Sequence, residues 1–308
     1  MNTRSPMPLP ENRALGAFLG LALGDSYGRE LEFIGSNAVY TAPVSLTPGC
    51  FRPTDDTFMS LYLAKAVLET DSYSDDAFGS AVGRQFAAWY HDPITPTTAP
   101  GMTCLRGIRT WIETGDWRTC GVPESDGCGA VMRVCPLPLR YSGETLTAAA
   151  RVSALVTHRH PNALDAAVVA SQLLRRVLET GEVGPELVWE VANQASTASV
   201  RSALEAAIVQ SQAPSDWLNE SAIPDGDGGW RSPSALGLAI YALLLFQHQG
   251  FEVVIDKAAR IHGDSDSVAC LAGMFYGAAH GVEALPSRWL DLLTEGAEIG
   301  RVVQQLLR

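Results

Sequence analysis

Two short segments of this sequence each place a pair of carboxylates at the start of an apolar stretch. Residues 264–267 read DSDS and precede VACLAGMFYGAAHG, and residues 54–57 read TDDT and precede FMSLYLAKAVLE. Aspartate, serine and threonine commonly cap helices, so one acid in each segment has a structural explanation. The second acid in each segment exceeds what a cap requires. Because the stretches that follow are typical of buried helices, these acids are expected at the edge of a dry core, where an unpaired carboxylate is costly.

Few basic residues stand near these acids to neutralise them. The helix expected after TDDT offers Lys65, and the segment before DSDS offers Lys257 and Arg260. A set of carboxylates and hydroxyls is the ligand type that Mg²⁺ or Mn²⁺ prefers, whereas zinc favours nitrogen and sulfur. We therefore predict that the two helix N-termini face each other and share metal ions.

Three other segments carry weaker signals. Glu32 in GDSYGRELEF (24–33) is either a solvent-exposed loop acid or part of the site. SDGCGAVMR (125–133) is either a tight turn or a backbone N–H cradle for phosphate, and its Arg133 in an apolar run needs a partner. His158 in THRHPNA has the ordinary alternative of a structural histidine. No HExxH motif occurs, and nothing favours pairing Cys128 with His158 as nucleophile and base.

Composition limits the class of protein. The chain has 308 residues, of which 46% are hydrophobic and 18% charged, so a substantial core is expected. The net charge of −12 and the absence of a Lys/Arg-rich run disfavour a nucleic-acid-binding surface. No apolar run is long enough to cross a bilayer and no signal segment is apparent, which predicts a cytoplasmic protein without membrane contact. For this size, a monomer is expected.

The elements that must position these residues read as helices. We predict an all-α fold, a single compact multi-helix domain over 13–308 after an N-terminal tail of residues 1–12. Gly16, Gly20 and Gly24 recur at every fourth position of the first helix and would permit close helix approach. A polar loop is expected from Asp25. The helices are expected at 13–24, from 54, at 74–92, 102–115, about 144–157, 161–180, 185–211, 234–248, 251–262, after 264, and over the last stretch, 286–308.

The motifs together resemble those of a known family. GAFLGLALGDSYGRELEF, TDDTFMSLYLAKAVLE, GCGAVMRVCPLPL, THRHPNA and HGDSDSVACLAGMFYGAAHG occur in the order found in ADP-ribosylglycohydrolases. This family includes proteins similar to dinitrogenase reductase-activating glycohydrolase and the ADP-ribosyl-acceptor hydrolases. The resemblance runs from about residue 13 to residue 281, and the TDDT and DSDS segments are its specific part. It implies an all-α fold with a binuclear Mg²⁺ or Mn²⁺ centre at helix ends.

The resemblance also implies roles for individual residues. It makes Glu32 a catalytic residue near the metals, with Asp56 and Asp264 as further candidates for moving the proton. It assigns ADP-ribose binding to the turn of Ser125, Asp126, Gly127 and Gly129, and a phosphate or ribose contact to His158. It implies that the metal ligands are Thr54, Asp55, Asp56, Asp264, Asp266 and Ser267.

The chain departs from the family pattern in three places. Cys128 stands where many members have Asn, which puts a polar contact in question. Ser267 stands where many have Thr, and the ligand oxygen is kept. His262 replaces a frequent Gly and would either reach toward substrate or fill space.

The predicted function is metal-dependent hydrolysis of the glycosidic bond between ADP-ribose and an acceptor, which reverses ADP-ribosylation. The substrate would be an ADP-ribosylated protein or small molecule, with arginine as the acceptor and ADP-ribose as product. Serine or another O-linked acceptor and a nucleobase stay open. The alternatives in other classes are a non-catalytic ADP-ribose-binding protein and a metal-dependent phosphoester hydrolase.

Overall fold

Helices make up the protein. The computed structural model describes residues 9–34 and 37–308, and within these ranges it contains no β-strand, only two isolated bridges. The all-α prediction is therefore confirmed. The α-helices are α1 (Glu11–Gly28), α2 (Asp55–Leu68), α3 (Asp75–His91), α4 (Met102–Thr114), α5 (Pro136–Arg140), α6 (Gly143–Leu155), α7 (Pro161–Thr180), α8 (Pro185–Ala192), α9 (Ala198–Ser211), α10 (Ser232–Phe246), α11 (Phe251–Ala259), α12 (Ser265–His280), α13 (Ser287–Leu290) and α14 (Gly296–Leu306).

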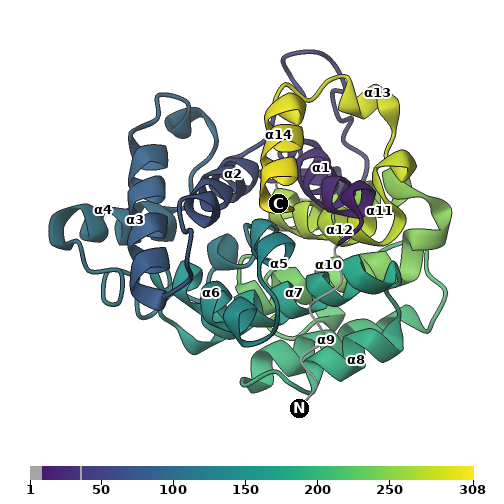
Figure 1. Ribbon diagram of the computed structural model, residues 1–308. Coiled ribbons are helices and arrows are strands. Elements are labelled where there is room, and N and C mark those ends of the chain that lie inside the picture. The colour runs from purple at the N-terminus through teal and green to yellow at the C-terminus, as the bar shows by residue number, and fades with distance from the viewer. Residues whose placement is uncertain (1–8, 35–36) are drawn as a thin grey trace.

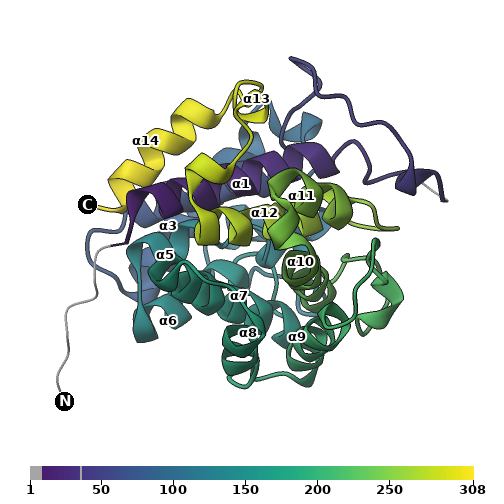
Figure 2. The ribbon, with the colours of Figure 1, turned by 90° about the vertical axis from the view of Figure 1, so that its right-hand side faces the viewer.

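Helices from the two ends of the sequence lie at the centre. α1 and α12 lie side by side in both ribbon views (Figures 1 and 2) and are buried along almost their whole length. Glycines line the contact: a Cβ atom on Gly20 would lie 2.2 Å from the carbonyl oxygen of Gly273, and one on Gly16 would lie 2.5 Å from that of Gly277. Only residues without a side chain permit backbones to approach this closely. The fourfold glycine spacing thus serves helix packing, as predicted.

The remaining helices surround this pair. In Figure 1, α2, α3 and α4 lie on one side, α5 to α9 lie below, and α11, α13 and α14 lie with α1. Their buried apolar side chains form one continuous hydrophobic cluster that includes residues of α1, α2, α7, α10 and α12. One shared core of this kind is what a single multi-helix domain requires.

Four predicted helix limits were wrong. α1 does not end before Asp25 but continues to Gly28, because Asp25 and Ser26 are buried and bonded rather than solvated. The predicted 185–211 helix is two helices, since the Asp165 carboxylate accepts hydrogen bonds from the backbone of Ser196 and Thr197 and starts α9 there. The last stretch likewise divides into α13 and α14. Residues 1–8 of the predicted tail lie outside the described residues, and α1 begins at Glu11 rather than Arg13.

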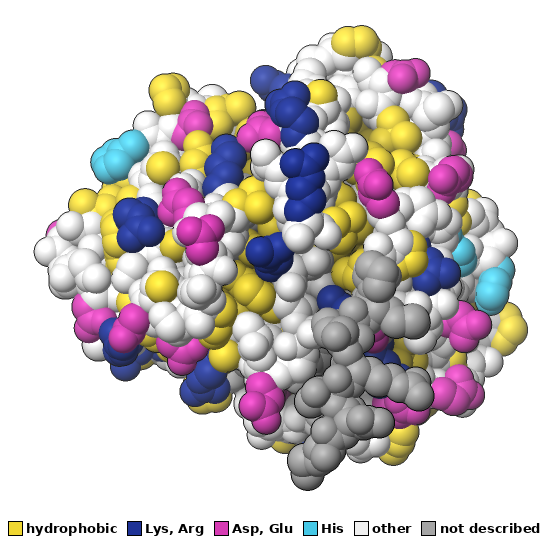
Figure 3. Space-filling view, in the orientation of Figure 1, with side chains coloured by type: hydrophobic (Ala, Val, Ile, Leu, Met, Phe, Trp, Pro, Cys, Tyr) yellow, Lys and Arg dark blue, Asp and Glu magenta, His cyan; other side chains and the backbone are white. Residues whose placement is uncertain are grey.

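Two further predictions concern the absence of a nucleic-acid-binding surface and the absence of membrane-spanning helices. On the face shown in Figure 3, basic side chains are separated from one another by apolar, neutral and acidic ones. The expected lack of a basic nucleic-acid-binding surface stays a prediction. None of the described helices combines the length and the apolar character that crossing a membrane would need.

Candidate active site

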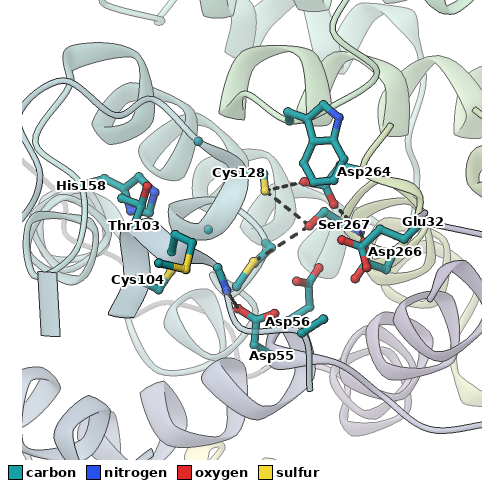
Figure 4. A pocket seen from close by; sticks show the side chains of 17 residues that line it. Glu32, Asp55, Asp56, Thr103, Cys104, Cys128, His158, Asp264, Asp266 and Ser267 are labelled. Atoms are coloured by element: carbon teal, nitrogen blue, oxygen red, sulfur yellow. Dashed lines mark hydrogen bonds between the residues drawn. The ribbon is translucent and has the colours of Figure 1, made fainter. Parts of the chain in front are cut away.

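The N-termini of α2 and α12 border one cavity of about 230 Å³. Each begins with a side-chain cap: Thr54 Oγ1 accepts a hydrogen bond from the Asp56 amide at 3.3 Å, and Asp264 Oδ1 accepts one from the Ser267 amide at 3.4 Å. Capping therefore explains the presence of Thr54 and partly that of Asp264, but it does not explain why Asp55 and Asp56 are there. In Figure 4, Asp55 and Asp56 from α2 face Asp264 and Asp266 from the start of α12 across this cavity.

Glu32 completes the cluster from a third element. It lies in the turn just after α1, and its carboxylate oxygens come within 4.8 Å of those of Asp264 and Asp266. The close contact of α1 with α12 explains this, because a Cβ on Gly28 would overlap the backbone of Asp266. Two oxygens in the cluster, Glu32 Oε2 and Asp56 Oδ2, are buried without a hydrogen-bond partner. Unpaired buried carboxylate oxygens of this kind are suitable ligands for a hard divalent cation.

The electrostatics of the cluster lead to the same inference. Burial raises the pKa of Asp55, Asp56 and Asp264 well above the ordinary value for aspartate. Burial, followed by repulsion from Asp266 and the neighbouring aspartates, raises the pKa of Glu32 to about 10. The described residues that line the cavity include no lysine or arginine. A bound cation would reverse the sign of these shifts, since its charge stabilises the ionised carboxylates.

Asp25 is a further buried acid that the sequence reading placed in a polar loop. Its carboxylate accepts hydrogen bonds from the amides of Thr54 at 2.9 Å and Thr57 at 3.0 Å, and from the Thr57 hydroxyl at 2.5 Å. Asp25 thus joins the end of α1 to the start of α2. The sequence did contain a signal for this buried acid, because Asp25 continues the small-residue pattern of α1. The sequence Gly-Asp-Ser is also typical of a helix end, and for this reason we predicted a loop there.

Neighbouring loops orient the metal-ligand candidates. The Gly101 amide donates to Asp55 Oδ2 at 3.1 Å, and the Cys128 thiol donates to Asp264 Oδ2 at 2.7 Å. Ser267 lines the cavity, with its hydroxyl 3.5 Å from Cys128 Sγ. The thiol of Cys128 therefore supplies a polar contact at the position where the sequence put one in question. Thr54 lies behind this layer and does not line the cavity.

The glycine-rich turn forms part of the opposite wall. Gly127 and Gly129 line the cavity, whereas Ser125 and Asp126 do not. Asp126 pairs with Arg231 at 3.1 Å, and Ser125 Oγ lies 2.9 Å from Thr103 Oγ1, so both hold the turn in place. The amides of Gly127 and Cys128 already donate to Ser125 Oγ and to the Trp230 carbonyl, so these two cannot serve as the predicted phosphate cradle without rearrangement.

Two histidines singled out by the sequence have different positions. His158 lines the cavity, is 1% exposed, and has a pKa lowered to about 3 by burial and by Arg133. It is therefore a neutral imidazole in the cavity wall. His262 bonds to Glu220 at 2.7 Å and to Tyr40 at 3.0 Å, and it does not line the cavity.

Apolar residues at the cavity mouth were missed by the sequence reading. Trp230 and Met102 line the cavity and are 44% and 78% exposed, and Phe33, 75% exposed, lies with its ring 6.5 Å from that of Trp230. Exposed residues in loops or at the first position of a helix carry no periodic signal, so only the structure brings them together.

Comparisons with known proteins agree with this geometry. Residues 6–308 match the family described as ADP-ribosylglycohydrolase. The chain is 29% identical to the ADP-ribosyl-[dinitrogen reductase] glycohydrolase of Rhodospirillum rubrum over 97% of both chains. It is 27% identical to the ADP-ribosylarginine hydrolase Tri1 of Pseudomonas putida, over 96% of this chain and 78% of that one. A solved structure named ADP-ribosylglycohydrolase-related protein complex superposes with a TM-score of 0.75 and 28% identity, covering 97% of this chain and 98% of that chain.

Proposed function

This chain belongs to the ADP-ribosylglycohydrolase family, and from that premise we propose that it releases ADP-ribose from arginine side chains in a reaction that depends on two divalent cations. Family membership makes it an enzyme that hydrolyses linkages of ADP-ribose. The acceptor, the metals and the roles of individual residues are our proposals.

The observation that carries the proposal is the carboxylate cluster of Glu32, Asp264 and Asp266, whose oxygens lie within 4.8 Å of one another. Asp55 and Asp56 border the same cavity, and two carboxylate oxygens lack a partner. We propose that Mg²⁺ or Mn²⁺ ions bind here through Thr54, Asp55, Asp56, Asp264, Asp266 and Ser267. Thr54 would need a small shift to serve as a ligand, because its hydroxyl now caps α2. When bound, the cations would hold the ribose hydroxyls and polarise the sugar and a water molecule.

The chain's own residues would then carry the proton transfers. Water forms a bond to the anomeric carbon while the bond from this carbon to the guanidino nitrogen breaks, and the bonding electron pair stays on the nitrogen. We assign the proton from the water to Glu32 Oε2, because this oxygen has no other partner, and Asp56 or Asp264 would serve if Glu32 does not. The released nitrogen then takes this proton from Glu32, which gives free ADP-ribose and arginine and returns the carboxylate to its starting state. A transition state of oxocarbenium character is expected, as in other glycosidic cleavages.

The cavity mouth supports arginine as the acceptor. A guanidinium group is cationic and planar, and it interacts favourably with carboxylates and with aromatic faces. The acids lie at the base of the cavity, and Trp230 and Phe33 lie at its edge. A serine acceptor would use neither feature. One relative, from Pseudomonas putida, is named for arginine, which supports the same choice.

The metal dependence can be tested by mutation and by chelation. Asp55→Ala and Asp266→Ala should each reduce release of ADP-ribose below detection, and EDTA should do the same to the unmodified protein. Addition of Mg²⁺ or Mn²⁺ should restore the EDTA-treated protein but not the variants. Full activity in a preparation free of metal would disprove the proposal.

The acceptor can be tested by presenting a panel of substrates to the metal-loaded protein. ADP-ribosyl-arginine, ADP-ribosyl-serine and ADP-ribosylated nucleic acid are incubated in parallel, and free ADP-ribose is measured by chromatography. Release from the arginine substrate alone is the expected result. Preferential release from either of the others would assign a different acceptor, and release of phosphate would indicate phosphoester hydrolysis instead.

A further inference from the structure

Arg133 is a fully buried cation that has no carboxylate partner among the described residues. Its guanidinium group donates to the carbonyl oxygens of Gly129 and Ser153 and to the hydroxyl of Thr157, and it lies over the ring of Phe86. Burying a charge is costly unless it is both paired with an opposite charge and hydrogen-bonded. Two of these contacts lead directly to the cavity wall, because Gly129 lines the cavity and Thr157 precedes His158.

The Thr157 hydroxyl connects Arg133 to His158. Arg133 Nη2 lies 2.6 Å from Thr157 Oγ1, and this oxygen lies 2.8 Å from His158 Nδ1. The arginine can only donate, so it occupies one lone pair of the hydroxyl oxygen. The hydroxyl proton is then available for one further bond.

Two acceptors compete for that proton. The Ala154 carbonyl oxygen lies 3.4 Å from Thr157 Oγ1, whereas His158 Nδ1 lies 2.8 Å from it. Hydrogen bonds from a hydroxyl are normally 2.7–2.8 Å long, so the bond to His158 is the stronger one. With Nδ1 accepting, the neutral imidazole carries its proton on Nε2. The opposite arrangement, in which Nδ1–H donates to Thr157 Oγ1, leaves the hydroxyl only the 3.4 Å bond to the Ala154 carbonyl oxygen.

Nε2 lies on the side of the ring next to the glycine-rich turn. A Cβ on Gly127 would lie 3.5 Å from Nε2, and a Cβ on Gly129 would lie 3.1 Å from the adjoining ring carbon. Both glycines and His158 line the cavity, and no described residue accepts a hydrogen bond from Nε2. The ring thus offers an unused donor at a wall where other donors are already engaged.

We propose that Arg133 is a positioning residue for anion binding: through Thr157 it holds His158 in the tautomer whose Nε2–H faces the cavity, and its buried charge favours a diphosphate at that wall. This inference rests on the proposed function, and on the phosphate contact that the family resemblance implies for His158. It explains why an acidic protein keeps an uncompensated arginine behind its substrate cavity, and it gives Thr157 a role that the family resemblance did not assign.

Variants of Thr157 test the inference without removing the buried arginine, whose loss could prevent folding. Thr157→Val keeps the shape of the side chain and removes the hydroxyl, whereas Thr157→Ser is the matched control that keeps the hydroxyl. In the ligand-free protein, ¹⁵N chemical shifts of His158 should show a protonated Nε2 for the unmodified protein and for Thr157→Ser. Thr157→Val should show a mixture of tautomers or a protonated Nδ1.

Binding and turnover supply the second readout. Calorimetry with ADP-ribose should give a Kd about 10-fold weaker for Thr157→Val, the effect of one lost hydrogen bond to a charged group, and an unchanged Kd for Thr157→Ser. KM should rise by a similar factor while kcat changes little, because the reacting bond is not involved.

Two results would overturn the inference. One is a protonated Nδ1 on His158 in the unmodified protein, which needs no ligand and so does not depend on the proposed function. The other is ADP-ribose binding by Thr157→Val at unchanged affinity, which would leave Thr157 and His158 with a structural role only. If the unmodified protein bound no ADP-ribose at all, the proposed function would fail together with the anion-binding part of the inference, whatever the tautomer.

Discussion

Gly20→Ala adds a single methyl group where α1 and α12 are in contact through their backbones. The new Cβ would lie 2.2 Å from the carbonyl oxygen of Gly273. The atoms that this Cβ would overlap all belong to the backbone of α12, so no side chain can rotate away. The two helices must separate, and the whole contact between them is loosened.

Two opposing terms set the size of the effect. Alanine is favoured over glycine within a helix by about 1 kcal/mol. Forcing extra volume into a tightly packed core costs about 1–3 kcal/mol and occasionally more, and here a backbone-to-backbone overlap is at the upper end or beyond. We therefore expect Gly20→Ala to lower the free energy of unfolding by about 2 kcal/mol.

The chain offers a matched control in Gly300. This residue lies within α14, and a Cβ built on it meets no atom within 4 Å. Gly300→Ala gains the helix propensity without the overlap and should be more stable than the unmodified protein by about 0.5–1 kcal/mol. Urea denaturation followed by circular dichroism measures both, and the two variants should differ by about 3 kcal/mol.

Activity gives an independent readout of the same change. Asp266 lies at the start of α12, and Glu32 follows α1, so separating these helices separates the two carboxylates. A misplacement of about 1 Å can reduce turnover about 100-fold. If Gly20→Ala were as stable as Gly300→Ala, or fully active, the close approach of the helices would not be what assembles the site.

Three further predictions follow from the buried acids and the cavity mouth. Burial and Asp266 raise the pKa of Asp25 from 3.8 to about 7, so the folded metal-free protein holds a proton that the unfolded chain releases. The free energy of unfolding should therefore fall as the pH rises from about 4 to 7, by up to about 1.4 kcal/mol per pH unit for each such group. Urea titrations with EDTA should show this slope, and Mg²⁺ should flatten it. In the Mg²⁺-loaded protein, where Asp25 is expected to be ionised, Asp25→Asn should lower the free energy of unfolding by about 2 kcal/mol, because it weakens the hydrogen bonds from Thr54 and Thr57 at the start of α2. Asp71→Asn on the surface should have no effect, and equal thermal midpoints for the two variants would refute this. Trp230→Ala should raise KM for an ADP-ribosyl-arginine peptide about fivefold without weakening the binding of ADP-ribose itself. The control Trp189→Ala, also at an exposed tryptophan, should change neither quantity. A loss of ADP-ribose affinity in Trp230→Ala would mean that Trp230 contacts the ADP-ribose rather than the acceptor.

The sequence predicted the helices best where local pattern decides them. α2, α3 and α4 have close to their expected limits because side-chain caps start α2 and α3, and Gly115 in the left-handed conformation ends α4. Errors occurred where a distant residue decides the boundary. The start of α9 depends on Asp165, which comes from α7 and could not be inferred from residues 185–211.

The candidate site was predictable in its acids and less so in its surroundings. Two motifs of acids before apolar helices were enough to predict that α2 and α12 meet, because both needed the same neutralising partner. Asp126 illustrates the opposite case, since its sequence context suggests a ligand contact and its carboxylate is occupied by Arg231. Which polar groups are already paired within the protein is a property of tertiary contacts, and no spacing rule reveals it.

The pairing of α1 with α12 also affects how the protein folds during its synthesis on the ribosome. Residues 16–28 are synthesised long before their partners at 266–281, so the small-residue face of α1 stays uncovered while the chain between them is made. Contacts between such distant parts of a chain form slowly. The acids from α2 exist early, but they gain Asp264 and Asp266 only when α12 emerges. An incomplete chain should therefore be inert, and activity should appear only after the C-terminal segment has closed the fold.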